Sequence, residues 1–208
     1  MNPGLLEALT VVATAAWAMT GALAAGRYRM DWIGVFVVAS VTALGGGSIR
    51  DVLLDHHPLY WVANPWILAV TTAAAILAMA TAGFVERMKH AYIAIDAIGL
   101  VVVTIIGCDI ARQMGHSPVI AVLAGVITGC GGGIIRDVLC NQVPLLFSSE
   151  IYAGASIVTG ATYVSGLALG LNVEATALVA IGVGLALRLL AVWRKWGLPV
   201  FAYTGNWR

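Results

Sequence analysis

The sequence has few charged residues. Only 10% of its 208 residues are Asp, Glu, Lys or Arg, whereas soluble domains carry about 25%. Because so few charges cannot cover the surface of a soluble domain of this size, the composition excludes an ordinary cytosolic enzyme and a disordered chain. The net charge is only +1. It offers no basic face for phosphates, so we expect no nucleic-acid partner.

Other chemical signals are also scarce. The three cysteines, Cys108, Cys130 and Cys140, form no CxxC pair, so we predict buried thiols. The adjacent His56 and His57 cannot make a closed metal site alone, and no metal is predicted. The N-terminus lacks the positive n-region of a secretory signal, so the first apolar segment is expected to stay in the membrane. No common catalytic or nucleotide-binding motif occurs, and we predict neither an enzyme nor a cofactor.

Apolar residues dominate what is present. They make up 61% of the chain, and the mean hydropathy is +0.94. A membrane-spanning helix needs about 20 mainly apolar residues. Seven stretches qualify: Leu5–Gly26, Asp31–Leu54, Asn64–Val85, Ala91–Met114, Ser117–Cys140, Ser149–Leu169 and Val173–Trp193. The connections between them are short. We therefore predict an all-α integral membrane protein with seven transmembrane helices, in which residues 1–208 form a single bundle.

Lys and Arg are divided unequally between the two ends of these spans. One side would hold only one cation, Arg112, near the end of the fourth span. The other side would hold seven cations: Arg27, Arg29, Arg87, Lys89, Arg194, Lys195 and Arg208. Because cytoplasmic loops carry the excess of positive charge, we predict an outside N-terminus and a cytoplasmic C-terminus in the plasma (inner) membrane.

The chain contains an internal repeat. The segment GGGSIRDVL at Gly45–Leu53 recurs 86 residues later as GGGIIRDVL at Gly131–Leu139. Repeat one (residues 5–85) and repeat two (residues 91–170) would each hold three spans. Since three is odd, the second copy would enter the membrane from the opposite side. The pattern predicts an inverted 3+3 repeat plus a seventh helix at residues 173–195, an architecture typical of transporters and channels.

Each repeat has a glycine triplet within its second span. Each glycine costs about 0.8–1 kcal/mol relative to alanine in a helix interior, so three in succession favour a kink or a break. Such a break would expose backbone carbonyls to a water-filled path, whereas close packing between helices is the alternative interpretation. The predicted kinks are at Gly45, Gly46, Gly47, Gly131, Gly132 and Gly133.

An arginine and an aspartate follow each triplet. They are Arg50 and Asp51 in repeat one, and Arg136 and Asp137 in repeat two. Charges within the membrane cost about 2.5–3.5 kcal/mol on insertion scales, and they usually face the bundle interior and mark an ion or substrate path. Because consecutive helical residues point in different directions, we expect each charge to be balanced across the repeat interface or through water. A static ion pair that only stabilises the fold is the alternative.

Other polar residues are weaker candidates. Thr42 and Thr128 lie three residues before the triplets, where they could line a pore or bond to the preceding turn. Asp96 and Asp109 lie near the two ends of the fourth span, where they could line a path or sit at the level of the lipid headgroups. Glu7 opens the first span as an interfacial charge.

Several of these segments resemble a known family. GGGSIRDVLL at Gly45–Leu54, DAIGL at Asp96–Leu100, and GGGIIRDVLCNQVP at Gly131–Pro144 followed by Glu150–Ala153 resemble the prokaryotic trimeric intracellular cation channel family, also labelled as a glycine transporter domain family. The resemblance implies seven spans, an outside N-terminus and a symmetric homotrimer. Each protomer would have its own pore for monovalent cations, mainly potassium, shaped by the glycine triplets. By the same resemblance, the Arg-Asp pair of repeat two matches positions near the gate.

The sequence departs from the family's pattern at two places. Eukaryotic relatives carry a lysine-containing lipid-binding motif where this chain has Ser48–Asp51, so control by phosphoinositides is not expected. Repeat one of the family often begins with an acidic residue and a glycine, matching Asp96 and Gly99 of repeat two. This chain has Thr10 and Ala13 at those positions.

The leading hypothesis is therefore a potassium-conducting cation channel, with a pore in each protomer that the second and fifth spans line at their GGGxxRD motifs. The expected partners are monovalent cations, membrane lipids and two further copies of the chain. The residues alone do not separate a cation path from an anion path, because one Arg and one Asp per repeat cancel. The alternative is a secondary transporter of a small zwitterion such as glycine, whose carboxylate and ammonium the Arg and Asp would hold. A scaffold or membrane enzyme would instead have a dry interior and carry neither current nor substrate.

Overall fold

The structure is a computed structural model that describes residues 2–87, 91–148 and 151–197, and every regular element within these ranges is an α-helix. The long helices are α1 (Pro3–Arg27), α2 (Trp32–Leu53), α4 (Ile67–Arg87), α5 (Ala91–Gln113), α6 (Pro118–Leu139), α8 (Tyr152–Ala168) and α9 (Val173–Arg194). Two one-turn helices, α3 (Tyr60–Ala63) and α7 (Leu145–Ser148), lie between them. The prediction of an all-α protein is confirmed for the described residues.

The long helices begin where the sequence offers capping residues. Asp31 accepts a hydrogen bond from the backbone N–H of Gly34 at 2.7 Å and so caps α2, while Asn2 and Asn172 cap α1 and α9 in the same way. Because α1 and α6 each have a proline in the first turn, where its missing N–H costs nothing, both helices start sharply. Within the described ranges, the predicted spans therefore begin and end within a few residues of the helices.

The structure corrects the predicted connections in two places. His56–Ala63 and Asn141–Phe147 were expected to be loops, but they contain α3 and most of α7. Helices of four residues are too short to leave a periodic pattern in the sequence. Some predicted features lie outside the described residues: the start of the sixth span at Ser149, Glu150 of the quoted motif, and the cations Lys89 and Arg208.

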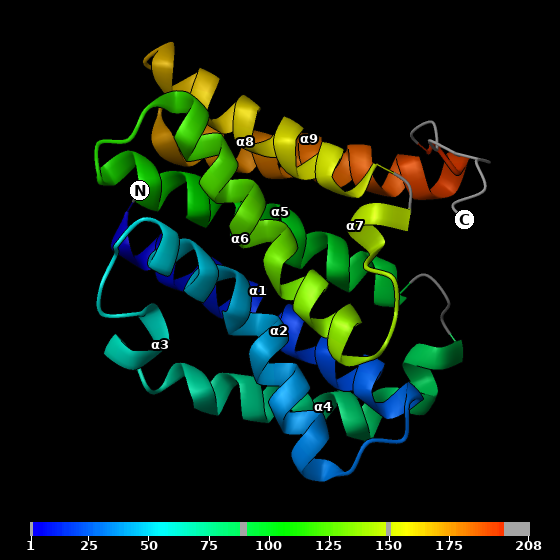
Figure 1. The fold of residues 1–208 in the computed structure, drawn as a ribbon. Helices are drawn as coiled ribbons and strands as arrows, with labels where there is room; N and C mark the ends of the chain where they lie inside the picture. Colours follow the sequence, from blue (N-terminus) through cyan, green and yellow to red (C-terminus); the bar gives the residue numbers. More distant parts are fainter. Residues whose placement is uncertain (1, 88–90, 149–150, 198–208) are drawn as a thin grey trace, which may run out of the picture.

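Five described helices are long and apolar enough to cross a membrane: α1, α2, α5, α6 and α9. In α4, a shorter apolar stretch covers Ile67–Gly83. Consecutive long helices run in alternate directions, and the N-terminus lies at the opposite end of the bundle from the end of α9 (Figure 1). This arrangement is that of a multi-pass membrane protein.

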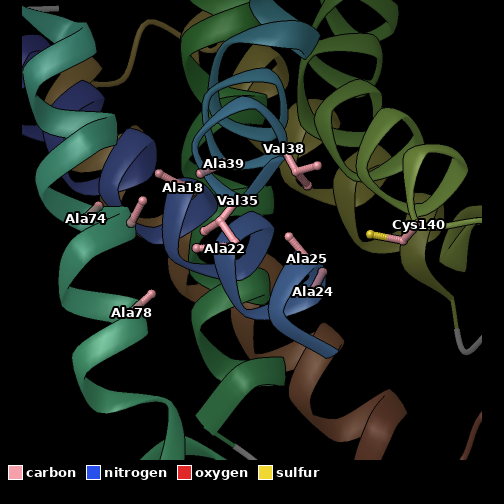
Figure 2. Packing of buried hydrophobic residues seen from close by; sticks show 11 residues of the cluster. Ala18, Ala22, Ala24, Ala25, Val35, Val38, Ala39, Ala74, Ala78 and Cys140 are labelled. Atoms are coloured by element: carbon pink, nitrogen blue, oxygen red, sulfur yellow. The ribbon is translucent and has the colours of Figure 1, made fainter. Parts of the chain in front are cut away.

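Helix α6 lies at the centre of the bundle. It packs against α2, α5 and α8, while α1 contacts α2, α4 and α5, and α9 covers α5 and α8 (Figure 1). Small side chains fill the space between α1, α2 and α4, as Figure 2 shows. The buried cluster there consists of Ala18, Ala22, Ala24, Ala25, Val35, Val38, Ala39, Ala74, Ala75, Ala78 and Cys140. Alanine lets neighbouring backbones approach closely, which is how helices associate where the hydrophobic effect is absent.

Candidate functional site

The two glycine triplets meet where α2 crosses α6. A Cβ atom on Gly46 would overlap the carbonyl oxygen of Thr128, and a Cβ atom on Gly132 would overlap the carbonyl oxygen of Thr42. Only glycine fits at either position because the obstacle is backbone, which cannot rotate away. The α-helical assignment continues through both triplets. The prediction of a broken turn is therefore wrong. Close packing between α2 and α6 explains why Gly46 and Gly132 are glycines. A kink of either helix at its triplet stays a prediction.

Thr42 and Thr128 are buried beside this crossing. Each hydroxyl donates a hydrogen bond of 2.6 Å to its own helix, at the carbonyl of Val38 or of Ala124. Such a bond satisfies the hydroxyl within the preceding turn, as the alternative interpretation expected. Thr128 also lines a cavity on the side of α3. A pore-lining role for both threonines stays a prediction.

The Arg-Asp pair of repeat one lies near the end of α2 that leads into α3. Arg50 donates to Oδ1 of Asp51 from Nε at 2.9 Å and from Nη2 at 2.6 Å. Asp51 Oδ1 also lies 3.1 Å from Nδ1 of His56, and Asp51 Oδ2 accepts the backbone N–H of Tyr60 at 3.4 Å. Both Arg50 and Asp51 are buried. This carboxylate ties the end of α2 to α3.

The Arg-Asp pair of repeat two holds more of the bundle together. Arg136 donates from Nε to Oδ1 of Asp137 at 2.8 Å, and from Nη1 to Oδ1 of Asp96 at 2.7 Å. The same Nη1 lies 3.4 Å from the hydroxyl of Thr20, and Asp137 Oδ2 accepts the backbone N–H of Leu145 at 2.9 Å. This Arg136 cluster, defined as Thr20, Asp96, Arg136 and Asp137, therefore joins α1, α5 and α6 and reaches the start of α7.

Each charge was expected to be balanced across the repeat interface or through water, but in both repeats the arginine bonds to the aspartate that follows it. The two Cβ atoms do point in different directions, but the long arginine side chain curves around the helix and brings Nε back to the next carboxylate. In repeat two, Asp96 adds a second carboxylate, but it comes from α5 of the same repeat, and the contact of Arg136 across the repeat interface is to the Thr20 hydroxyl. The position equivalent to Asp96 in repeat one is Thr10, so Arg50 has no counterpart to that carboxylate.

Aromatic residues that the sequence interpretation missed enclose the Arg136 cluster. The Arg136 guanidinium carbon lies 5.7 Å from the ring centroid of Tyr92, and Tyr152 is buried against Gly133 near the same guanidinium. Trp17 is also buried, and a Cβ atom on Gly99 or on Gly132 would overlap its ring. Gly99, part of the quoted DAIGL segment, is the signal that could have indicated a large neighbouring side chain, because a glycine within a helix leaves space for one.

A cavity of about 400 Å³ opens beside the Arg50–Asp51 pair. It lies between α1, α2, α3 and α5, and its lining includes Glu7, Thr10, Tyr60 and Trp61. We call it the α3-side cavity. It brings Glu7, predicted only as an interfacial charge, to the same space as the pair of repeat one.

Asp109 and the two histidines have structural partners. Asp109 is buried and accepts hydrogen bonds from the Tyr163 hydroxyl at 2.7 Å and from Arg112 Nη2 at 3.0 Å, which fastens α8 to α5. His56 contacts Asp51, as described above, whereas His57 is exposed. Among the described residues, no group of three or more His, Cys, Asp or Glu side chains could hold a metal ion.

Comparisons with known proteins agree on one family. The model of the glycine transporter family matches residues 7–83 and 93–168. The inner membrane protein YadS of Escherichia coli is 41% identical over 202 residues, covering 96% of this chain and 98% of its own. A membrane protein of Vibrio cholerae is 40% identical over 211 residues, covering 98% of this chain and 86% of its own.

Solved structures add the fold. A trimeric intracellular cation (TRIC) channel orthologue from Rhodobacter sphaeroides has a TM-score of 0.87 and 31% identity, covering 91% of this chain and 98% of its own. A second TRIC cation channel, described in a study of conductance, has a TM-score of 0.84 and 30% identity, covering 96% and 98% of the two chains. The resemblance noted in the sequence is therefore confirmed. These relatives are membrane proteins and channels, in agreement with the prediction that the chain is not an enzyme.

Proposed function

This chain belongs to the glycine transporter family, and from that premise we propose that it is a membrane channel for monovalent cations, with potassium as the main ion. The observation that carries the proposal is the likeness to solved TRIC channels, which extends over 91% of the chain at 31% identity. We propose that it assembles, as that orthologue does by its description, into a trimer in the inner membrane, surrounded by lipid. The carrier alternative draws on the family description and on the Arg-Asp pairs that could hold a zwitterion.

All seven long helices would cross the membrane, with the N-terminus outside. Five meet the length and composition of a span, and α4 and α8 have the same alternating place in the bundle (Figure 1). Most described cations near the helix ends gather at one end of the bundle. Arg27 and Arg194 are the last residues of α1 and α9, and Arg29 and Lys195 follow these helices. At the opposite end, apart from the buried Arg50, Arg112 is the one Lys or Arg among the described residues. By the positive-inside rule, the first end is cytoplasmic.

Equivalent residues support an inverted repeat of residues 5–85 and 91–170, followed by the seventh helix at 173–195. The contact of Gly46 with Thr128 is the reciprocal of the contact of Gly132 with Thr42, since each partner is shifted by 86 positions. The helix caps correspond as well. Asp31 and Ser117 cap α2 and α6, and both helices are followed by a residue with positive φ, Asp55 or Asn141. Reciprocal contacts of this kind are expected from a pseudo-twofold axis in the membrane plane.

The ion path would pass the crossing of α2 and α6, between the Arg50–Asp51 pair on the outer side and the Arg136 cluster on the cytoplasmic side. Gly45, Gly47, Gly131 and Gly133, with Thr42 and Thr128, would line it beside the two central glycines. In the Arg136 cluster, Asp96 changes the charge balance. Its carboxylate makes the four residues of the cluster formally −1, whereas the Arg-Asp pair alone would cancel. Arg27 and Arg188 lie over the Tyr92 and Tyr152 rings beside the cluster, and against their positive charge Asp96 shifts the balance towards cations.

The Arg136 cluster would also be the cytoplasmic gate. Its side chains are buried, and its bonds connect α1, α5, α6 and the start of α7. An ion passes only if these helices separate and the bonds are exchanged for water. Three buried polar atoms of this region, Asp96 Oδ2, Arg136 Nη2 and Tyr152 Oη, make no hydrogen bond to the described protein. They are groups that a hydrated ion or water could meet when the helices separate.

The substitution Asp96→Asn tests the proposal. The substitution removes the negative charge of the Asp96 side chain but keeps its size and one acceptor oxygen. In a bilayer with a potassium chloride gradient, the wild-type current should reverse near the potassium equilibrium potential, and the Asp96→Asn current should reverse closer to zero voltage. Asp55→Asn is the matched control, because the Asp55 side chain is 98% exposed in the connection after α2. An Asp96→Asn channel with unchanged selectivity would refute the role of the cluster, and saturable glycine uptake without current would favour the carrier.

A further inference from the structure

The α3-side cavity differs from the Arg136 cluster in being open. At about 400 Å³, it has the size of cavities that take small organic molecules, which range over about 300–1,000 Å³. The Arg50–Asp51 pair lines it, together with the aromatic residues Tyr60, Trp61 and Trp66. The other polar lining residues are Glu7, Thr10, Thr14, Ser48, Asn64 and Thr128. Leucine, isoleucine and valine side chains supply much of the rest.

The cavity lining carries a net negative charge. Its charged residues are Glu7, Arg50 and Asp51. Asp51 neutralises Arg50 at 2.6 Å, and Glu7 takes part in no ion pair with the described residues. The charge of Glu7 is therefore the one that a ligand in this cavity would meet unbalanced.

Aromatic rings line the same cavity as the Glu7 carboxylate. Tyr60, Trp61 and Trp66 all line the cavity. The Trp61 indole N–H lies 3.2 Å from the Ser48 hydroxyl, which holds this ring against α2. Burial, and secondarily the negative charge of Glu7, raise the pKa of Tyr60, so its phenol stays neutral beside the carboxylate. Rings and one carboxylate around an otherwise apolar space are what an alkylated ammonium ion needs, because the rings attract its charge and the space takes its methyl groups.

We propose that the α3-side cavity binds small organic cations that carry an alkylated ammonium group, with Glu7 as the counter-ion and Tyr60, Trp61 and Trp66 as the aromatic wall. The equivalent positions of repeat two have different residues, so we place such a site only on the α3 side. The residues equivalent to Leu6, Thr10 and Trp66 are Tyr92, Asp96 and Tyr152, which are largely buried around Arg136. In repeat two, Tyr92 takes the place of the smaller Leu6, and Asp96 takes the place of the uncharged Thr10 and pairs with Arg136.

Choline and 3,3-dimethylbutan-1-ol, its uncharged carbon isostere, are the probes. Binding to the purified full-length protein in detergent is measured by calorimetry in sodium chloride. We expect saturable binding of choline and at least tenfold weaker binding of the alcohol. Glu7→Gln should weaken choline binding by tenfold or more. Glu174→Gln, which changes an exposed glutamate at the start of α9, should leave it unchanged.

Trp61→Leu provides a second variant, since Trp61 lies on the short α3 and not within the bundle core. It should weaken choline binding while sparing thermal stability. Equal affinity for choline and the alcohol would show that the cavity does not recognise the positive charge but only takes apolar groups, such as those of a lipid, and would overturn the proposal. Choline binding that Glu7→Gln leaves intact would overturn the assignment to this site, and no binding of choline at tens of millimolar would refute it.

A consequence for transport rests on the proposed channel function. Choline added on the side of the N-terminus should reduce potassium current, and Glu7→Gln should relieve the block. Choline added on the other side should have no effect. The two claims fail separately: a protein that binds choline but passes no current contradicts the channel, whereas a conducting protein that binds no choline contradicts the site.

Discussion

The crossing of α2 and α6 yields a prediction from two adjacent glycines. A Cβ atom on Gly46 would overlap backbone of α6, whereas a Cβ atom on Gly47 would meet only the end of the Arg50 side chain, at 3.8 Å. Alanine should improve the intrinsic helix propensity at both positions by about 0.8–1 kcal/mol. Only Gly46→Ala also overpacks the contact between α2 and α6, which lowers the free energy of unfolding by about 1–3 kcal/mol or more. Gly47→Ala should therefore be as stable as the wild type or slightly more stable.

Thermal unfolding of the two purified variants in the same detergent measures this difference. For a chain of this size, each kcal/mol corresponds to about 2–4 °C in Tm, so Gly46→Ala should melt at least a few degrees below Gly47→Ala. The two variants place the same alanine at neighbouring positions of α2, so effects that any glycine-to-alanine change has there cancel when the two melting temperatures are compared. If the two variants melt together, the backbones of α2 and α6 do not approach as closely as the structure indicates.

Three further substitutions test other contacts. Thr10→Asp would supply the carboxylate that repeat one lacks; it should pair with Arg50 and lower potassium flux into liposomes, and undiminished flux would contradict the equivalence of the repeats. Tyr163→Phe removes the bond to the buried Asp109 carboxylate. It should cost about 1.5–3 kcal/mol of stability, and an unchanged melting temperature would argue against that bond. Asn172→Ala removes a cap that accepts two backbone N–H groups. It should cost about 1 kcal/mol, most of which Asn172→Ser should restore.

Much of the fold could be predicted from the sequence because its signals are local. Apolar runs of about 20 residues define spans, and residues such as Asp31 and Asn172 cap helices by bonds to their own next turn. The repeat of GGGxxRD placed the two Arg-Asp pairs at equivalent positions. The one-turn helices α3 and α7 escaped prediction because four residues show no period.

The partners of the charges could not be predicted in the same way. That Arg136 reaches Asp96 depends on how α5 packs on α6, and no local pattern encodes the distance between two helices. In the sequence, Trp17 cannot be distinguished from the other apolar residues of its span. In the structure, its ring fills the space beside Gly99 and Gly132. Comparing the repeats was informative where they differ: Asp96 corresponds to Thr10, so Arg136 has a second carboxylate partner and Arg50 does not.

The most direct test of the account is a recording from the purified wild-type protein in a planar bilayer, with a potassium chloride gradient and no amino acid present. The account predicts stepwise currents that reverse near the potassium equilibrium potential. A silent bilayer, made from a preparation whose liposomes accumulate labelled glycine with saturation, would contradict it and assign Arg50 and Arg136 to a carried substrate instead.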